Sequence, residues 1–294
     1  MIAVALGLLA AAANALASVL QRRASKNAPA GTFGPTLILD MVRQPLWLGG
    51  IAALIAAFGL QAAALSEAGL ALIQPILAAE LPFTMILIAW LPPRGFRRVP
   101  WTAVTLLSVG LAVLLIAASP AQGGGKPAPS DWVFAVIATV GCAAGLVTIA
   151  WLIGGPVRAV LLGVTTSLGF ALTAAFMKEV TEDFADGVLA VLTTWSLYAM
   201  ALTGLASLLL LQGALHAGSL VVVQPALTVT DPVASILLGV ALFDERLRGG
   251  SWIVLEIAGV ALILAGSIGI ARSPLLHEEH IATRGDGVTR APNR

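Results

Sequence analysis

Long apolar runs constrain this sequence more than any motif does. A helix needs about 20 consecutive apolar residues to cross the roughly 30 Å hydrocarbon core of a bilayer. Nine runs reach about this length, and they cover residues 2–20, 45–65, 68–91, 101–118, 132–152, 157–178, 190–211, 218–241 and 252–271. Apolar residues make up 59% of the chain and charged residues 11%, against about 25% charged in a soluble domain. The sequence therefore predicts an all-α polytopic membrane protein with about nine transmembrane helices.

Tryptophan marks the ends of these runs independently, because indole rings favour the membrane–water interface. Six tryptophans lie at predicted helix boundaries: Trp47, Trp90, Trp101, Trp132, Trp151 and Trp252. Trp195 lies further inside its run. The first run has no basic residue ahead of it, and Arg22 and Arg23 follow it, so we expect a retained helix and not a cleaved signal peptide.

Lysine and arginine predict which side of the membrane each end of the chain occupies. With nine crossings, the two termini face opposite sides. Four basic residues fall on the side of the N-terminus: Lys126, Lys178, Arg246 and Arg248. Twelve fall on the other side: Arg22, Arg23, Lys26, Arg43, Arg94, Arg97, Arg98, Arg158, Arg272, Arg284, Arg290 and Arg294. Because cytoplasmic loops carry the excess of Lys and Arg, we expect a multi-pass protein of the cell (inner) membrane with its N-terminus outside and its C-terminus in the cytoplasm.

Two matching stretches lie in the third and eighth runs. Residues 74–82 read QPILAAELP, and residues 224–232 read QPALTVTDP. A proline in a helix interior costs about 3 kcal/mol, because it removes a backbone hydrogen bond and clashes with the preceding turn. The pattern predicts paired broken or kinked helices around a site near the bilayer midplane, as in many secondary transporters. The helix-breaking residues would be Pro75, Pro82, Pro225 and Pro232.

Further matches extend this repeat over most of the chain. Trp101 and Trp252 open the helices that follow the two stretches, and Leu6-Gly7 in the first run matches Leu162-Gly163 in the sixth. Helices 1–4 thus resemble helices 6–9, and the odd helix between them reverses the direction of the second copy. The prediction is an inverted repeat, which favours alternating access. Its parts are a first repeat at 1–118, a flexible linker at 119–131, a connecting helix at 132–152, a second repeat at 153–272 and a disordered cytoplasmic tail at 273–294.

Each of the two matching stretches carries a carboxyl group, Glu80 in the first and Asp231 in the second. Both lie near the middle of their runs, where an ionised carboxylate costs several kcal/mol (about 2.5 or more) unless it is paired or hydrated. Burial there favours the protonated form, so both residues are candidates for proton or cation coupling. The alternative is a structural role, in which each carboxyl group binds backbone atoms freed by Pro82 or Pro232 and holds a kink.

Polar side chains in the apolar runs complete the set of candidate pathway residues. Amides can both donate and accept hydrogen bonds, which suits a polar organic substrate, although they can equally join membrane helices structurally. An aromatic ring can stack on an aromatic or cationic ligand, but it can equally be packing. The candidates are Gln74, Gln224, Gln61, Gln212, Asn14 and Tyr198.

Other function classes lack their signatures in this sequence. There is no Walker-type glycine loop, no HExxH and no GxSxG. The net charge is +1, basic stripes with interleaved aromatic residues are absent, and the lone Cys142 can form no intramolecular disulfide. We therefore expect no enzyme activity, no cofactor, no metal cluster and no nucleic-acid partner; the expected partners are the lipid bilayer and a small-molecule substrate.

The second half of the chain resembles the drug/metabolite transporter superfamily, and within it the EamA-like group. The resemblance rests on VVVQP at 221–225, DPVASILLGVALFDERL at 231–247 and EIAGVALILAGS at 256–267, and it extends over nearly all of residues 1–272. Members of this family usually have ten helices, so the resemblance implies that the first helix is absent here. The nine-helix layout also resembles the NIPA-type magnesium transporters. Residues 92–98 (PPRGFRR) depart from the family pattern, because they replace the acidic residue found at Asp244-Glu245.

Together these observations predict a secondary active transporter of a small organic metabolite or drug that works by alternating access, with proton coupling as a candidate mechanism. Two alternatives stay open. The cargo could be Mg²⁺ or another divalent cation, for which two midplane carboxylates would be a sparse site. The protein could also be a non-transporting membrane partner, since a duplicated scaffold need not transport.

Overall fold

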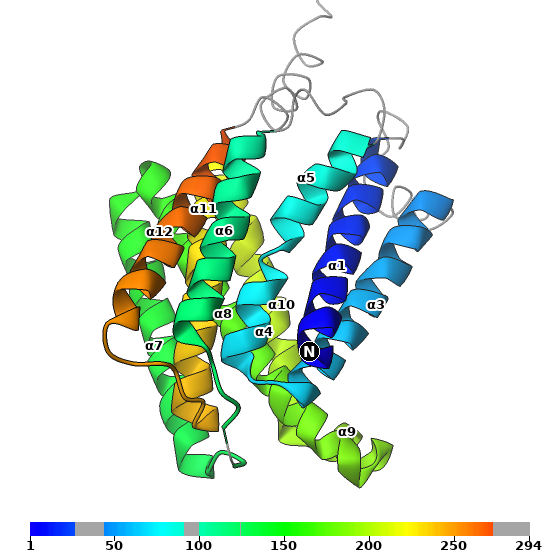
Figure 1. Ribbon diagram of the computed structural model, residues 1–294, viewed down its shortest axis with the longest axis vertical. Helices are drawn as coiled ribbons and strands as arrows, with labels where there is room; N and C mark the ends of the chain where they lie inside the picture. The colour runs from blue at the N-terminus through cyan, green and yellow to red at the C-terminus, as the bar shows by residue number, and fades with distance from the viewer. Residues whose placement is uncertain (27–43, 91–99, 124, 273–294) are drawn as a thin grey trace, which may run out of the picture.

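The computed structural model describes residues 1–26, 44–90, 100–123 and 125–272 (Figure 1). The predicted loop at 92–98 and the predicted tail at 273–294 lie outside these ranges. The helices are α1 (Ile2–Lys26), α3 (Pro45–Glu67), α4 (Leu70–Leu77), α5 (Glu80–Trp90), α6 (Trp101–Ala118), α7 (Pro129–Ile153), α8 (Gly155–Glu182), η2 (Asp183–Asp186), α9 (Val188–Thr193), α10 (Trp195–Ala217), α11 (Leu220–Phe243) and α12 (Trp252–Ala271).

Nine spans within the described ranges are long and apolar enough to cross a bilayer, with α4 and α5 together forming one of them. The chain is an all-α, multi-pass membrane protein. The predicted fold class is therefore confirmed. One predicted boundary is wrong: Trp195 is the first residue of α10 and does not lie further inside a helix. The backbone is extended at Thr194 (φ −73°, ψ 139°), which separates α9 from α10 and moves the start of the span to the tryptophan.

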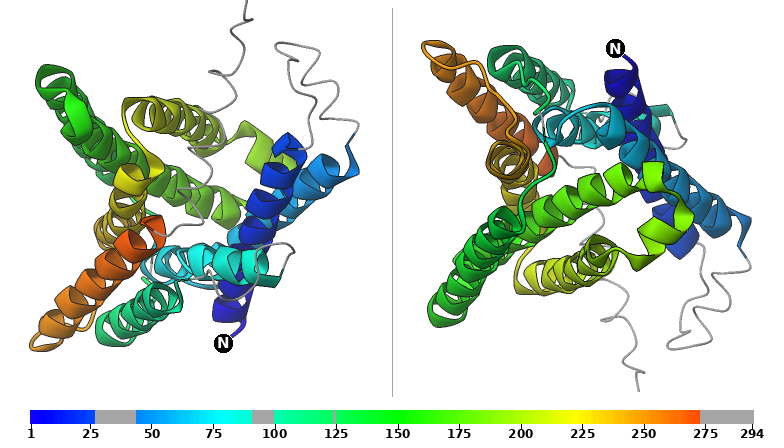
Figure 2. Two further views of the ribbon diagram at one scale, coloured as in Figure 1. Left: turned by 90° about the horizontal axis from the view of Figure 1, so that it is seen from above. Right: turned by 90° about the horizontal axis from the view of Figure 1, so that it is seen from below.

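The spans alternate in direction, so the molecule has two faces (Figure 1). The N-terminal face carries Met1, the junction between α3 and α4, and the end of α11. The C-terminal face carries the start of α6 and the end of α12. Viewed along the helix axes, α6 and α12 lie side by side at one edge of the bundle (Figure 2). Among the spans α8 is the most buried, whereas α7 and α10 are the least buried and lie at the periphery.

The third span is broken at Ala78 and Ala79, between α4 and α5. Pro82 lies in the first turn of α5. Backbone amides in the first turn have no acceptor within the helix, so the absence of an amide hydrogen in proline removes no helical hydrogen bond. The equivalent span of the second half is a single helix, α11, which continues through Pro225 and Pro232. The predicted break is therefore present in the first copy, and the second copy crosses unbroken.

Both stretches carry the same prolines, but the residues between the prolines differ. In α11 this turn contains Thr228, whose hydroxyl group donates to the Gln224 carbonyl at 2.9 Å. The same hydroxyl oxygen accepts a bond from Ser267 of α12 at 3.2 Å. The first copy has Ala78 at this position, which can make neither bond.

Glycine lets α6 and α12 pack backbone against backbone. A Cβ added to Gly259 would lie 2.8 Å from the Leu114 nitrogen, and one added to Gly266 would lie 2.5 Å from the Leu107 nitrogen. From the other side, a Cβ on Gly110 would lie 2.7 Å from the Ile263 nitrogen. Small residues permit this kind of close approach between membrane helices. The seven-residue spacing of Gly259 and Gly266 keeps both glycines on one face of α12.

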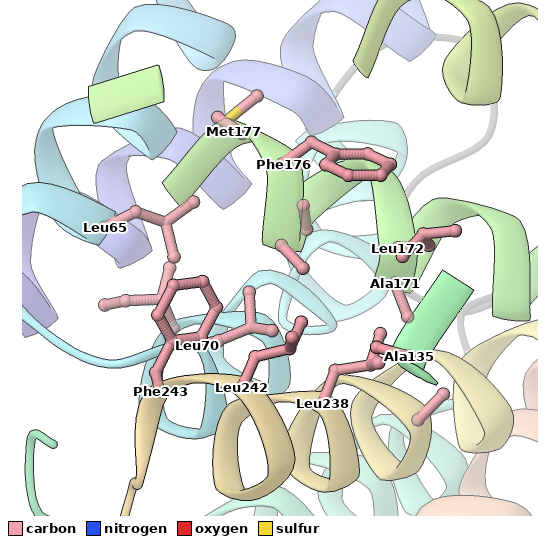
Figure 3. Close-up of a cluster of buried hydrophobic side chains, with 14 of the residues drawn as sticks. Leu65, Leu70, Ala135, Ala171, Leu172, Phe176, Met177, Leu238, Leu242 and Phe243 are labelled. Atoms are coloured by element: carbon pink, nitrogen blue, oxygen red, sulfur yellow. The ribbon is translucent and has the colours of Figure 1, made fainter. Parts of the chain in front are cut away.

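The main apolar core lies toward the N-terminal face (Figure 3). It joins the end of α3, the start of α4, and buried faces of α7, α8 and α11. Phe176 stacks on Trp132 with ring centroids 4.9 Å apart, and Phe243 meets Trp132 edge-on at 6.1 Å. Trp132 is only 4% exposed, so this predicted interfacial tryptophan serves mainly as core.

The segment between α6 and α7 is shorter than predicted, because α7 begins at Pro129 and not at residue 132. It is also tied to the loop after α11. The Ala121 nitrogen donates to the Arg246 carbonyl at 2.9 Å, and the Arg246 nitrogen returns a bond to the Ala121 carbonyl at 3.2 Å. The segment after α6 is thus joined to the loop after α11 on the N-terminal face.

Candidate functional site

Glu80 is the first residue of α5, directly after the break, and its carboxylate accepts two hydrogen bonds from α1. Asn14 Nδ2 donates to Oε2 at 3.3 Å, and Ser18 Oγ donates to Oε1 at 3.1 Å. Asn14 and Ser18 are one helical turn apart and share a face of α1. The structure therefore brings the predicted candidates Asn14 and Glu80 together. Ser18 was not among the predicted residues, although its spacing of four residues from Asn14 is a usable signal.

One face of α11 is polar along much of its length. Gln224, Thr228, Asp231 and Ser235 follow one another at intervals of four, three and four residues, which places them on the same side of the helix. Gln224 Nε2 donates to Thr228 Oγ1 at 3.4 Å. Asp231 Oδ1 and Ser235 Oγ are buried without a hydrogen-bond partner among the described residues. We call these four residues the polar face of α11.

Gln74 lies on α4, which packs antiparallel to α11. The two helices approach closely where a Cβ on Gly239 would lie 3.2 Å from the Ala71 nitrogen. Gln74 is three residues beyond Ala71, and Ser235 is four residues before Gly239. At about 1.5 Å of rise per residue, both lie roughly 5 Å deeper than this contact. Gln74 Nε2 is also buried without a partner in the described part of the chain, so unpaired polar atoms from two adjacent helices occur at the same depth.

Both candidate carboxyl groups lie halfway along their spans. Asp231 is the twelfth of the 24 residues of α11, and Glu80 is the eleventh of the 21 residues from Leu70 to Trp90. Their surroundings differ, because Glu80 aligns with Thr230 in the repeat and Asp231 follows one residue later. One residue corresponds to about 100° around a helix. Glu80 contacts α1 through Asn14 and Ser18, whereas Asp231 lies on the polar face of α11.

Three other predicted residues lie elsewhere. Gln212 is exposed on the peripheral helix α10, and Gln61 is half-buried on α3. Tyr198 is 64% exposed, and its hydroxyl group donates to the Leu192 carbonyl at 2.8 Å, which ties α10 to α9. The tyrosine thus has a structural contact that the sequence pattern did not indicate.

A buried ion pair, Lys178 with Glu245, was not among the predicted site residues. Lys178 Nζ of α8 lies 3.2 Å from Glu245 Oε1, and the two side chains are 4% and 0% exposed. Glu245 Oε1 also accepts from the Leu70 nitrogen at 2.6 Å, and Oε2 accepts from the Ala71 nitrogen at 2.7 Å. The only sequence signal was a short acidic–basic loop after α11, which ordinarily indicates a solvated surface.

Comparisons with known proteins leave the function open. No family model matches this chain. A Corynebacterium glutamicum protein described as uncharacterized is 26% identical over 277 residues, covering 93% of this chain and 96% of that protein. No solved structure matches. The similarity therefore extends over nearly the whole membrane bundle without supplying an activity.

Proposed function

We propose that this protein is a secondary active transporter of a small organic metabolite or drug, related to the drug/metabolite transporter superfamily. It works by alternating access, and Glu80 and Asp231 couple transport to protons or another cation. The observation that carries the proposal is the unpaired oxygen of Asp231, buried at the middle of a membrane-spanning helix. A carboxyl group placed there is costly for the fold, so an intramembrane ionisable residue is a functional candidate by default.

The unpaired polar atoms of α4 and α11 favour an organic ligand with both donor and acceptor groups. Gln74 Nε2 offers donor hydrogens, whereas Asp231 Oδ1 is an acceptor and Ser235 Oγ can act as either. Buried polar atoms that the protein leaves unpaired are free to bind a ligand group, and they discriminate strongly against ligands that cannot satisfy them.

Contacts between equivalent residues support an inverted repeat. A Cβ on Gly7 would lie 3.0 Å from Ile76 Cγ2, and a Cβ on the matching Gly163 would lie 3.4 Å from Ala226 Cβ. Ile76 and Ala226 each directly follow the proline of a Gln-Pro pair. Gly7 lies in the first turns of α1, near the N-terminal face, and Gly163 lies in the first turns of α8, near the opposite face. Repeats related in this way are typical of transporters that alternate their access.

The first test is thermal stabilisation of the purified protein by a panel of amino acids, nucleosides, cationic drugs, Mg²⁺ and other divalent ions. A ligand that binds the native state raises the unfolding midpoint according to the ratio of its concentration to its Kd. The compound that stabilises is then offered to proteoliposomes with an imposed pH gradient. We expect uptake that follows the gradient in the wild type and loses this dependence in the double variant Glu80→Gln, Asp231→Asn. Glu67→Gln, an exposed carboxyl at the end of α3, is the matched control.

Each outcome separates the proposal from its alternatives. Unchanged uptake and pH dependence in the double variant would refute the coupling role. Stabilisation by Mg²⁺ alone would favour the divalent-cation alternative. If no compound of the panel raises the unfolding midpoint and another subunit always co-purifies with the protein, the result would favour a non-transporting membrane partner.

A further inference from the structure

The Lys178–Glu245 pair joins three elements at the N-terminal face. Lys178 comes from α8, Glu245 follows α11, and the two amides that bind Glu245 open α4. Asp244 has a positive φ of 52°, and the Glu245 nitrogen donates to the Gly239 carbonyl at 3.2 Å, so the end of α11 turns the carboxylate back into the bundle. The positive end of the α4 dipole and the lysine ammonium group then hold one negative charge between them.

The space around this carboxylate is shaped for it. A Cβ on Gly69 would lie 2.5 Å from the Glu245 carboxyl carbon, and one on Gly239 would lie 2.6 Å from Oε2. Lys178 Nζ lies 4.6 Å above the Phe243 ring, and Phe243 belongs to the aromatic cluster with Trp132 and Phe176. The pair is thus covered by rings and glycines, and Phe243, which lies against Lys178, belongs to the main apolar core (Figure 3).

The element held by this pair also leads to the candidate site. Helix α4 has eight residues, carries Gln74, and ends at the break that separates it from Glu80. A short helix that ends at two small residues, Ala78 and Ala79, can move separately from the helix that follows it. If the amides of Leu70 and Ala71 left Glu245, the start of α4 could move away from α8 and α11 and uncover the polar atoms behind it.

We propose that the Lys178–Glu245 pair is a latch that keeps the N-terminal face closed, and that it separates when the transport pathway opens to that face. The structure accordingly represents a state closed on the N-terminal side. This inference rests on the proposed transport function, because it assigns a moving part to it. A residue with a merely structural role would support the fold in every state and would not change which side of the membrane can reach the site.

The test measures access to position 235 from each side. Cys142, which is exposed on α7, is first replaced by serine. The substitution Ser235→Cys then supplies a single thiol, which lies roughly 6 Å deeper in the bundle than the contact of α4 with α11. The protein is placed in sealed vesicles of known orientation, and a membrane-impermeant maleimide is added to one side at a time. The latch is weakened by Glu245→Gln and, to avoid leaving a lone buried lysine, by the double variant Lys178→Met, Glu245→Gln. Lys126→Gln, which removes an exposed ion pair with Asp183 on the same face, is the matched control.

We expect weakening the latch to raise the labelling rate from the N-terminal side by about tenfold or more, corresponding to about 1.4 kcal/mol, and to lower the rate from the C-terminal side. The control should match the parent. Unchanged labelling from the N-terminal side in folded variants, with normal labelling from the opposite side, would overturn the latch alone. A thiol that reacts from neither side in any variant would overturn the transport pathway, and the latch with it.

Discussion

Glu245 illustrates how strongly the contribution of a charged residue to stability depends on its burial. Its pair with Lys178 is almost completely enclosed, whereas in the Lys126–Asp183 pair the side chains are 55% and 20% exposed. Removing one partner of a buried pair leaves an uncompensated charge and typically costs about 3–5 kcal/mol. An exposed pair contributes about 0–1 kcal/mol, because water screens it.

We therefore expect Glu245→Gln to lower the thermal midpoint of the detergent-solubilised protein far more than Lys126→Gln does. The double variant Lys178→Met, Glu245→Gln should recover part of the loss, because it removes the stranded ammonium group. Thermal unfolding of the three variants at neutral pH measures the difference. Equal effects of the two single substitutions would contradict the buried character of the Lys178–Glu245 pair.

The exposed pair adds a pH signature to this comparison. The hydrogen bond from Lys126 holds the pKa of Asp183 below its ordinary value. A carboxyl group with a depressed pKa in the folded state stabilises the protein above its unfolded-state pKa of about 3.9, and this contribution is lost as the pH falls through the folded-state pKa. The part of the difference between wild type and Lys126→Gln that comes from Asp183 should persist from pH 7 to about pH 5 and be lost as the pH falls below about 3.9, through the folded-state pKa.

At the scale of elements, the contact between α6 and α12 depends on glycine more than on large side chains. Gly259 and Gly266 let two backbones meet at distances that no Cβ would allow. In contrast, Gly141 and Gly145 of α7 form a small-residue pair with nothing within 4 Å of an added Cβ among the described residues. Glycine pairs on these two helices therefore have different structural consequences.

We expect Gly259→Val to lower the unfolding free energy by about 1–3 kcal/mol, at the upper end of the range for overpacking because backbone atoms cannot move aside. Gly141→Ala should change it by less than about 1 kcal/mol, in the stabilising direction, because alanine favours the helix. Denaturation of both variants in the same detergent tests this contrast. A neutral Gly259→Val would show that α6 and α12 do not pack as closely as described.

At the scale of the whole molecule, nine crossings place the two ends of the described bundle on opposite faces. Three of the stretches outside the described ranges, 27–43, 91–99 and 273–294, follow the ends of α1, α5 and α12, which lie at the C-terminal face. Seven of the twelve basic residues predicted to be cytoplasmic lie in these segments: Arg43, Arg94, Arg97, Arg98, Arg284, Arg290 and Arg294.

The positive charges predict that the C-terminal face is cytoplasmic. We expect an epitope tag after Arg294 to be protected from protease in intact spheroplasts, and a tag before Met1 to be cleaved. Permeabilised spheroplasts, in which both tags are cleaved, are the control. The reverse pattern would place the Lys178–Glu245 pair on the cytoplasmic side and show that the charge bias misleads here.

The sequence by itself determined the number of spans, their approximate bounds and the midplane depth of Glu80 and Asp231, because these depend on local properties. An apolar run must match the thickness of the hydrocarbon, and a residue at its centre lies near the midplane wherever the neighbouring helices are. The alignment of the two Gln-Pro stretches also follows from the sequence alone, because it compares residue types and does not depend on which residues are in contact.

Only the tertiary structure decided which helix breaks, what each carboxyl group faces, and where the buried ion pair lies. Equivalent prolines leave α11 unbroken, and in the turn between them Thr228 is bonded to Ser267 of another helix. Glu80 accepts hydrogen bonds from Asn14 and Ser18, which lie more than 60 residues earlier in the chain. Glu245 follows a helix in a short loop, and such a residue becomes buried only when α4 and α8 meet around it. These contacts join residues distant in the chain, and the identity of a residue does not specify its neighbours.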